Sequence, residues 1–250
     1  KITNFQKFKL VTKFLDNLDI EDKKFKEKLN GINIKEQLNS NGIISPKNSI
    51  YINELEIHKL IQSLIIKFQN LNNIERNYLK EDSNKIEFYK CDDQIIELIH
   101  SNINFIRRSE TWIRILFIAS LKKDINRAQI IYRKDTSYNV EILKLSNKFS
   151  ADSLIKEYFN IYNNSQKNCL PVPPESSYKY TDALLKNKDC EKAFIDEWIG
   201  IKNFKLGERD KPEMQICYGY EKDPQFFLKN KHFQELSLKL YEPLIRALEG

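Results

Sequence analysis

Metal-dependent DNA hydrolysis is one chemistry whose residues can be sought directly in this sequence. Nucleases built on a strand meander followed by a helix carry an Asp on the second strand and an Asp/Glu-x-Lys on the third. The carboxylates hold Mg²⁺ against the scissile phosphate, and the Lys positions or activates the attacking water. That tripeptide occurs only as Glu21-Asp22-Lys23 and the overlapping Asp22-Lys23-Lys24, inside a charged run typical of a solvated helix face. We therefore expect no catalytic residue and no metal site.

Basic residues are concentrated in the middle of the chain and suggest a second chemistry, the binding of phosphates. Beside aromatic residues such as Tyr132 and Tyr138, they could track a nucleic-acid backbone. The alternative is a solvated rim with no partner. A net charge of +6 and a pI near 8.9 permit contact with nucleic acid without requiring it. The candidate DNA-binding residues are Arg107, Arg108, Arg114, Lys122, Lys123, Arg127 and Arg133.

Other catalytic and metal-binding signatures are missing from the sequence. It has no Walker lysine loop, no G-x-G-x-x-G, no G-x-S-x-G and no H-E-x-x-H. Its four cysteines and three histidines are scattered, which argues against structural zinc and favours reduced thiols in a cytoplasmic protein. No apolar run reaches the length of a membrane span. The chain opens without Met in a helical pattern, so we expect a fragment of a longer protein.

Helical periodicity marks the first part of the chain. Residues 2–18 predict an amphipathic helix. Residues 50–79 predict a long helix facing the core, with Asn53 as its N-cap.

After residue 79, apolar and polar residues alternate with a period of two, which indicates strands. Residues 86–90 and 96–100 predict a hairpin about an Asp92-Asp93 turn, and residues 103–107 a third strand. The remaining predicted elements are a helix at 110–123 capped by Ser109, a hairpin of 128–133 and 139–145, and helices at 150–162, 178–185, 190–199 and 233–248.

A proline-rich stretch, Leu170-Pro171-Val172-Pro173-Pro174, interrupts this order. Proline fixes φ and lacks a backbone donor, so no regular element can run through it. We predict two parts: residues 1–168, a helical N-terminal region with an α/β core, and residues 169–250, the proline-rich linker with a helical extension packed on that core.

The predicted fold class is α/β, with a mixed sheet flanked by helices. A meander followed by a helix suggests a restriction-endonuclease-like, PD-(D/E)XK core. The predicted third strand has no carboxylate and ends in Arg107-Arg108, which would repel a metal and attract phosphate. We therefore expect a catalytically degenerate core.

The chain resembles the C-terminal domain of the RecC family, the gamma subunits of exodeoxyribonuclease V. The similarity covers most of the chain and is densest from Ser109 to Leu184. The residues that carry it are Trp112, Leu116, Leu121, Arg133-Lys134-Asp135, Ser150–Tyr162, Pro174-Glu175-Ser176, Ala193–Gly200, Gly207-Glu208 and Leu240-Tyr241-Glu242-Pro243-Leu244.

This resemblance implies a nuclease-like fold without nuclease activity. Compared with catalytic relatives, the second-strand Asp would fall near His100 and the Asp-x-Lys around Ile106 and Arg108, and carboxylates are missing at both places. The domain would be a scaffold that contacts RecB-like and RecD-like subunits and helps to form DNA strand channels. No cofactor is implied for this chain, because ATP and Mg²⁺ serve the partner subunits.

Two other functions stay open. One is an active nuclease of the same fold with a migrated site, for which the candidate carboxylates are Asp92, Asp93, Glu97 and Glu110. The other is a simple DNA-binding module, whose affinity would fall steeply with salt. The scaffold function instead predicts an apolar surface for partner subunits.

Overall fold

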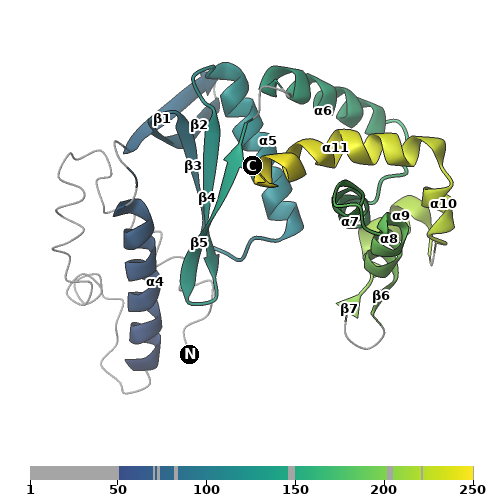
Figure 1. Cartoon of the computed structure of the whole chain (residues 1–250), viewed down its shortest axis with the longest axis horizontal. Coiled ribbons are helices and arrows are strands. Elements are labelled where there is room, and N and C mark those ends of the chain that lie inside the picture. Colours follow the sequence, from purple (N-terminus) through teal and green to yellow (C-terminus); the bar gives the residue numbers. More distant parts are fainter. Residues whose placement is uncertain are drawn as a thin grey trace. The chain divides into compact units, whose positions relative to one another are not determined.

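The computed structural model describes residues 51–69, 71, 74–81, 84–145, 150–201, 205–220 and 222–249 (Figure 1). The predicted helix at residues 2–18 lies outside these ranges. The chain divides after Leu145 into two compact units. The division comes before the predicted helix at 150–162, whereas the sequence predicts a boundary after residue 168.

The first unit is built around one mixed sheet. Its elements are α4 (Tyr51–Gln69), β1 (Ile74–Glu81), β2 (Asn84–Cys91), β3 (Gln94–Ile99), α5 (Phe105–Leu121), β4 (Arg127–Lys134) and β5 (Ser137–Lys144). The five strands lie in chain order, and all neighbours are antiparallel except β3 and β4, which are parallel. Helix α5 makes the crossover that a parallel pair requires. The predicted mixed α/β class is confirmed.

Helices cover both faces of this sheet: α4 lies along one side and α5 along the other (Figure 1). The burial of the central strands agrees with helices on both faces of the sheet. The consecutive residues Ile95 and Ile96 of β3 are both buried, as are Ile130 and Ile131 of β4. Successive side chains of a strand point to opposite faces. Buried neighbours therefore mean that each face has its own packed layer.

Two predictions about this unit were wrong. The helix expected to run to residue 79 ends at Gln69, and Ile74–Glu81 is a strand paired with β2. The sequence after Gln69 has Asn at positions 70, 72 and 73, and asparagine is a poor helix former.

The strand expected at residues 103–107 is also wrong, because α5 begins at Phe105. The Asn104 side chain caps the helix by accepting a hydrogen bond of 2.9 Å from the Arg107 backbone N–H. Ser109, the predicted cap, lies inside the helix. The two predicted hairpins are confirmed as β2–β3 and β4–β5, and Asp92 and Asp135 take positive φ in their turns.

The second unit is mainly helical. Its elements are α6 (Ala151–Ser165), α7 (Pro174–Leu185), α8 (Cys190–Ile199), β6 (Gly200–Ile201), β7 (Lys205–Leu206), the 3₁₀ turn η2 (Glu208–Asp210), α9 (Pro212–Tyr218), α10 (Gln225–Leu228) and α11 (Lys231–Glu249). The four helices predicted from residue 150 onward are all present. No helix in the described part of the chain is long and apolar enough to cross a membrane.

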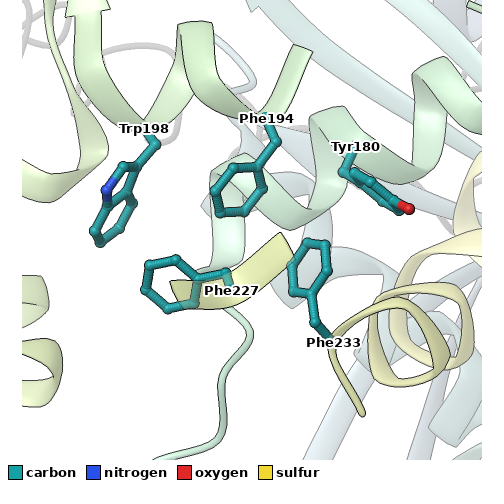
Figure 2. Close-up of a cluster of buried hydrophobic side chains, with 5 residues drawn as sticks. All are labelled: Tyr180, Phe194, Trp198, Phe227 and Phe233. Carbon is teal, nitrogen blue, oxygen red and sulfur yellow. The ribbon is translucent and has the colours of Figure 1, made fainter. Parts of the chain in front are cut away.

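Five buried aromatic side chains form the core of this unit: Tyr180, Phe194, Trp198, Phe227 and Phe233 (Figure 2). Phe194 is central, with ring centroids 5.1 Å from Phe233 and 5.6 Å from Phe227. Most of these contacts are edge-to-face or tilted, which is the arrangement that aromatic quadrupoles favour. The rings come from α7, α8, α10 and α11, so this cluster ties the helices of the unit together.

The proline-rich stretch leads directly into α7, with Pro174 at the first helical position. Pro173 precedes the helix and offers no side-chain cap. The buried carboxylate of Glu208 takes that role from η2, because it accepts from the backbone N–H groups of Glu175 at 2.8 Å and Ser176 at 2.7 Å. The Ser176 hydroxyl donates a third bond of 2.6 Å. A distant carboxylate thus satisfies donors that would otherwise lack partners.

Candidate functional site

The α5 face of the sheet carries two glutamates in one cross-strand row. Glu97 of β3 lies opposite Ile130 of β4, and Ile130 lies opposite Glu141 of β5. Paired residues point to the same face. Two strand spacings place the glutamate backbones roughly 10 Å apart, with the fully buried Ile130 between them.

An arginine of α5 reaches the first of these carboxylates. The Nε of Arg114 donates to Oε1 of Glu97 at 2.8 Å, and its Nη2 donates to the backbone carbonyl of Glu87 on β2. Burial raises the pKa of Glu97 above its usual value, and the charge and hydrogen bond of Arg114 oppose that rise. Arg114 therefore fastens the helix to two neighbouring strands through one side chain.

A second arginine, Arg108, reaches the other carboxylate in a bidentate arrangement. Its Nε lies 3.0 Å from Oε2 of Glu141 and its Nη2 lies 2.8 Å from Oε1. Burial, with the nearby Glu141 charge, raises the pKa of Tyr132 above its usual value. Fork-to-fork pairs of this kind are among the strongest charge-assisted hydrogen bonds.

The predicted DNA-binding residues are not all brought together. Arg108 and Arg114 face the sheet in these ion pairs, whereas the exposed Arg107 pairs with Glu110 on α5 itself. Lys122, Lys123 and Arg127 follow the other end of the helix, about 22 Å from Arg107 at 1.5 Å per residue.

Arg133 lies apart from the rest. It is on β4 opposite Tyr138, on the face away from Glu141. The basic residues that cluster in sequence thus fall into a sheet-bound pair, a group at the end of α5 and single positions.

The positions expected for a degenerate nuclease site also separate. His100 directly follows β3, and its Nδ1 hydrogen-bonds the Tyr138 hydroxyl at 3.0 Å. Ile106 and Arg108 lie in the first turn of α5 and not on a third strand, so the strand count behind their assignment was wrong. The observed second and third strands carry Glu87 and Glu97 in their middles.

The four carboxylates proposed for a migrated site do not converge. Asp92 and Asp93 form the β2–β3 turn, roughly 13 Å along β3 from Glu97 at 3.3 Å per residue. Glu110 is held by Arg107 on α5. Within the described ranges, no three His, Cys, Asp or Glu side chains gather closely enough to hold a metal ion.

Sequence reasoning missed the partner of each arginine on the sheet. The sequence suggests Glu97 only as a metal ligand and suggests no role for Glu141. A signal was present, since each glutamate stands between apolar residues in a strand, Ile96 and Leu98 or Val140 and Ile142. A carboxylate at such a position needs a buried cation or hydrogen bonds.

Comparison with known proteins finds no matching family model and no matching curated protein. The site is therefore described from its geometry alone. It consists of two sheet carboxylates, each paired with an arginine of the crossover helix α5. Carboxylates held in this way fix the helix on the sheet.

Proposed function

We propose that this chain is a non-catalytic scaffold domain of the gamma subunit of exodeoxyribonuclease V, an ATP-dependent helicase–nuclease of the cytoplasm. That enzyme processes DNA ends for the repair of double-strand breaks by recombination. The domain would contact RecB-like and RecD-like subunits and help to shape the channels for the DNA strands. ATP and Mg²⁺ would be used by those partners.

One observation carries this proposal: both glutamates of the cross-strand row are bound by arginines. A metal-dependent nuclease needs carboxylates that can take a divalent cation. Glu97 and Glu141 instead take the guanidinium groups of Arg114 and Arg108. An arginine cannot give up its charge, so these contacts serve to hold α5 against the sheet.

The order of elements gives further support. A three-strand antiparallel meander is followed by a helix and a parallel fourth strand. A meander followed by a helix is the pattern that suggests a nuclease-like core. The proposal thus keeps the nuclease-like architecture and assigns the acidic side chains a structural use.

A surface for partner subunits is offered by α5. Ile106, Ile113 and Leu121 are each about half exposed, at 49%, 50% and 52%. Positions separated by seven or eight residues share one face of a helix, so these side chains form an apolar stripe on the side away from the sheet. Obligate interfaces are enriched in such apolar residues.

Co-expression with the RecB-like and RecD-like subunits of the same organism tests the partner assignment. The tagged chain should recover both subunits, and the double change Ile106→Asp with Ile113→Asp should reduce recovery at least tenfold. Ile66→Asp on α4, where Ile66 is 54% exposed, is the matched control and should leave recovery unchanged. Recovery equal for both variants would reject the α5 surface, and no recovery by the unaltered chain would reject the scaffold function.

A cleavage assay separates the scaffold from an active nuclease. The purified chain is incubated with linear DNA and Mg²⁺ or Mn²⁺, and we expect no cleavage above buffer. Cleavage that Glu97→Gln abolishes would favour the migrated nuclease site. Binding to DNA alone, steeply dependent on salt and without partner recovery, would favour the DNA-binding module.

A further inference from the structure

One cross-strand row at the end of the main sheet carries three polar or charged side chains. Arg133 of β4 lies directly opposite Tyr138 of β5. Side chains paired in this way share a face of the sheet, with Cβ atoms about 5 Å apart. His100 comes directly after β3, and its Nδ1 forms a hydrogen bond of 3.0 Å with the Tyr138 hydroxyl. The row therefore joins β3, β4 and β5 on the face away from Glu97 and Glu141.

Arg133 differs from the arginines that reach the sheet from α5. Arg108 and Arg114 each pair with a carboxylate, whereas Arg133 makes no ion pair with any residue that the structure describes. Its side chain is partly buried, and its Nε is shielded from water without a hydrogen-bond acceptor among those residues. Because arginine keeps its charge in a folded protein, the fold leaves a desolvated donor and a positive charge uncompensated. A bound ion is one established reason for such a group in a native fold.

The part of α4 beside this row contributes lysines and no acidic residue. Ser63 of α4 accepts a hydrogen bond of 2.9 Å from the Tyr138 backbone N–H, so the helix lies next to the row. Lys59 and Lys67 stand four residues before and after Ser63, which places all three on one face of the helix. No acidic residue lies between these lysines. Asp135, in the β4–β5 turn, is exposed and forms no ion pair within the described part of the chain. The surroundings of the row therefore favour an anion.

We propose that Arg133 is the anchor of a phosphate site at this end of the sheet, bordered by His100 and Tyr138. The ligand is inorganic phosphate or a phosphate monoester, whose oxygens match the paired N–H donors of a guanidinium. Its negative charge would compensate Arg133, and Lys59 and Lys67 would attract it from a distance. The site is independent of the scaffold function proposed above.

The placement of Arg133 favours one terminal phosphate over the backbone of a nucleic acid. A protein that tracks a backbone neutralises several phosphates. Arg127 lies on the same strand and the same face, but six residues separate it from Arg133, or about 20 Å along the strand. Arg108 and Arg114 hold their ion pairs on the opposite face. Arg133 is therefore placed to take a single phosphate group.

The test is an NMR titration of the ¹⁵N-labelled chain with inorganic phosphate at constant ionic strength. We expect saturable shifts of the backbone amides of His100, Arg133 and Tyr138. Arg133→Gln keeps most of the side-chain stem and should weaken phosphate binding at least about tenfold, because it removes the charge and the paired donors. Without phosphate, this variant should melt no lower than the unaltered chain, since the fold loses an uncompensated charge and no hydrogen bond.

Two short single-stranded DNAs of one sequence, with a 5′-phosphate or a 5′-hydroxyl, identify the source of the phosphate. If the phosphorylated strand binds more tightly than both the hydroxyl strand and inorganic phosphate, the site takes a DNA end. If it binds no more tightly than inorganic phosphate, the site takes a small phosphorylated molecule. Equal shifts of the three amides by both strands would mean that Arg133 meets backbone phosphates, and would overturn the proposal.

Arg127→Gln is the matched control for the phosphate titration. It removes the same charge from an exposed position at the other end of β4, so phosphate affinity should stay within about twofold, because screening weakens interactions over that distance. The proposal is overturned if phosphate leaves the amides of the row unshifted, or if Arg127→Gln weakens binding as much as Arg133→Gln. It is equally overturned if Arg133→Gln melts at a lower temperature than the unaltered chain, because the fold would then already supply an acceptor.

Discussion

Arg114 of α5 donates to Glu97 of β3 at 2.8 Å, and the Glu97 side chain is only 14% exposed. The same helix carries a second ion pair, Arg107 with Glu110, whose side chains are 62% and 59% exposed. Both pairs have ordinary contact distances, so their difference lies in the surroundings. An ion pair near the interior feels a lower effective dielectric than one in water, and removal of one partner leaves a charge that is costly to bury.

Replacing each arginine by alanine should therefore give unequal results. We expect Arg114→Ala to lower the free energy of unfolding by about 1–3 kcal/mol, because Glu97 loses its cation and hydrogen-bond donor at a position with little access to water. Arg107→Ala should cost less than about 0.5 kcal/mol. Urea denaturation measures both values. With Trp198 replaced by Phe, Trp112 becomes the sole tryptophan and reports the first unit. Equal losses would show that Glu97 is not held as described.

The bidentate pair predicts a specific requirement for arginine at position 108. A lysine keeps the charge of Arg108 but cannot donate two parallel hydrogen bonds to Glu141. Arg108→Lys should lower the free energy of unfolding by about 1–2 kcal/mol, whereas Arg107→Lys should leave it within about 0.5 kcal/mol of the unaltered chain. A urea series on the two variants checks the difference, and the prediction fails if Arg108→Lys is as stable as Arg107→Lys.

The sequence predicted the elements whose signals are local and missed relationships between distant residues. The β4–β5 hairpin and helix α8 follow from alternating or helical spacing alone. Strand β1 was missed because Ile74–Glu81 contains adjacent charged residues and no regular alternation. It lies at a sheet edge, where Arg76 pairs with Glu87 of β2. The start of α5 was misplaced because Asn104 and Ser109 are both acceptable caps, and only tertiary packing selects one.

The candidate site shows the same limit more clearly. Arg108 and Glu141 are 33 residues apart, and Arg114 and Glu97 are 17 apart. A charge in sequence does not reveal which charge it meets, because that depends on strand register and on the side of the helix that faces the sheet. The arginines could be recognised from sequence as a group, but their roles could not.

Glu208 gives a prediction for the second unit. Its carboxylate accepts three hydrogen bonds at the start of α7, all from donors that need an acceptor. In Glu208→Gln an amide NH₂ would replace one oxygen and face those donors, so we expect a loss of about 1–3 kcal/mol in unfolding free energy. Glu213→Gln, at an exposed position in α9, is the control and should stay within about 0.5 kcal/mol. Trp198 fluorescence in a Trp112→Phe background follows this unit; no loss in Glu208→Gln would mean that the carboxylate does not cap α7.

The same residue predicts a pH dependence with a definite sign. Burial raises the pKa of Glu208 above 4.5 in the folded state, although its hydrogen bonds with Ser176 and Glu175 oppose the rise. The folded state then binds the proton of Glu208 more tightly than the unfolded state does. Glu208 therefore contributes most to the stability of the folded state at low pH. Its contribution falls as pH rises from about 4.5 through the raised pKa. The stability advantage of the unaltered chain over Glu208→Gln should therefore shrink over that range and then level off. Urea midpoints of the two proteins between pH 4 and 8 measure it, and an advantage that grows with pH would contradict the raised pKa.

Gly207 lies where the turn into η2 passes the end of α8. Of the substitutions considered, we expect a change at Gly207 to lower the free energy of unfolding most. A Cβ at this position would lie 2.3 Å from the backbone oxygen of Trp198 and 2.4 Å from the carbonyl carbon of Ile199. Backbone atoms cannot rotate away, so Gly207→Ala should force η2 from α8 and cost about 3 kcal/mol or more. It should also change the near-ultraviolet circular dichroism of the aromatic core around Trp198.

Gly219→Ala is the matched control, because Gly219 has open space but a φ of +90°. Its cost should be about 1–3 kcal/mol from backbone strain alone, with the aromatic signal unchanged. The prediction fails if the free energy of unfolding of Gly207→Ala is within about 1 kcal/mol of that of the unaltered chain and the aromatic signal is unchanged. In that case η2 does not pack against α8 as described, and the position of Glu208 at the start of α7 would also be in question.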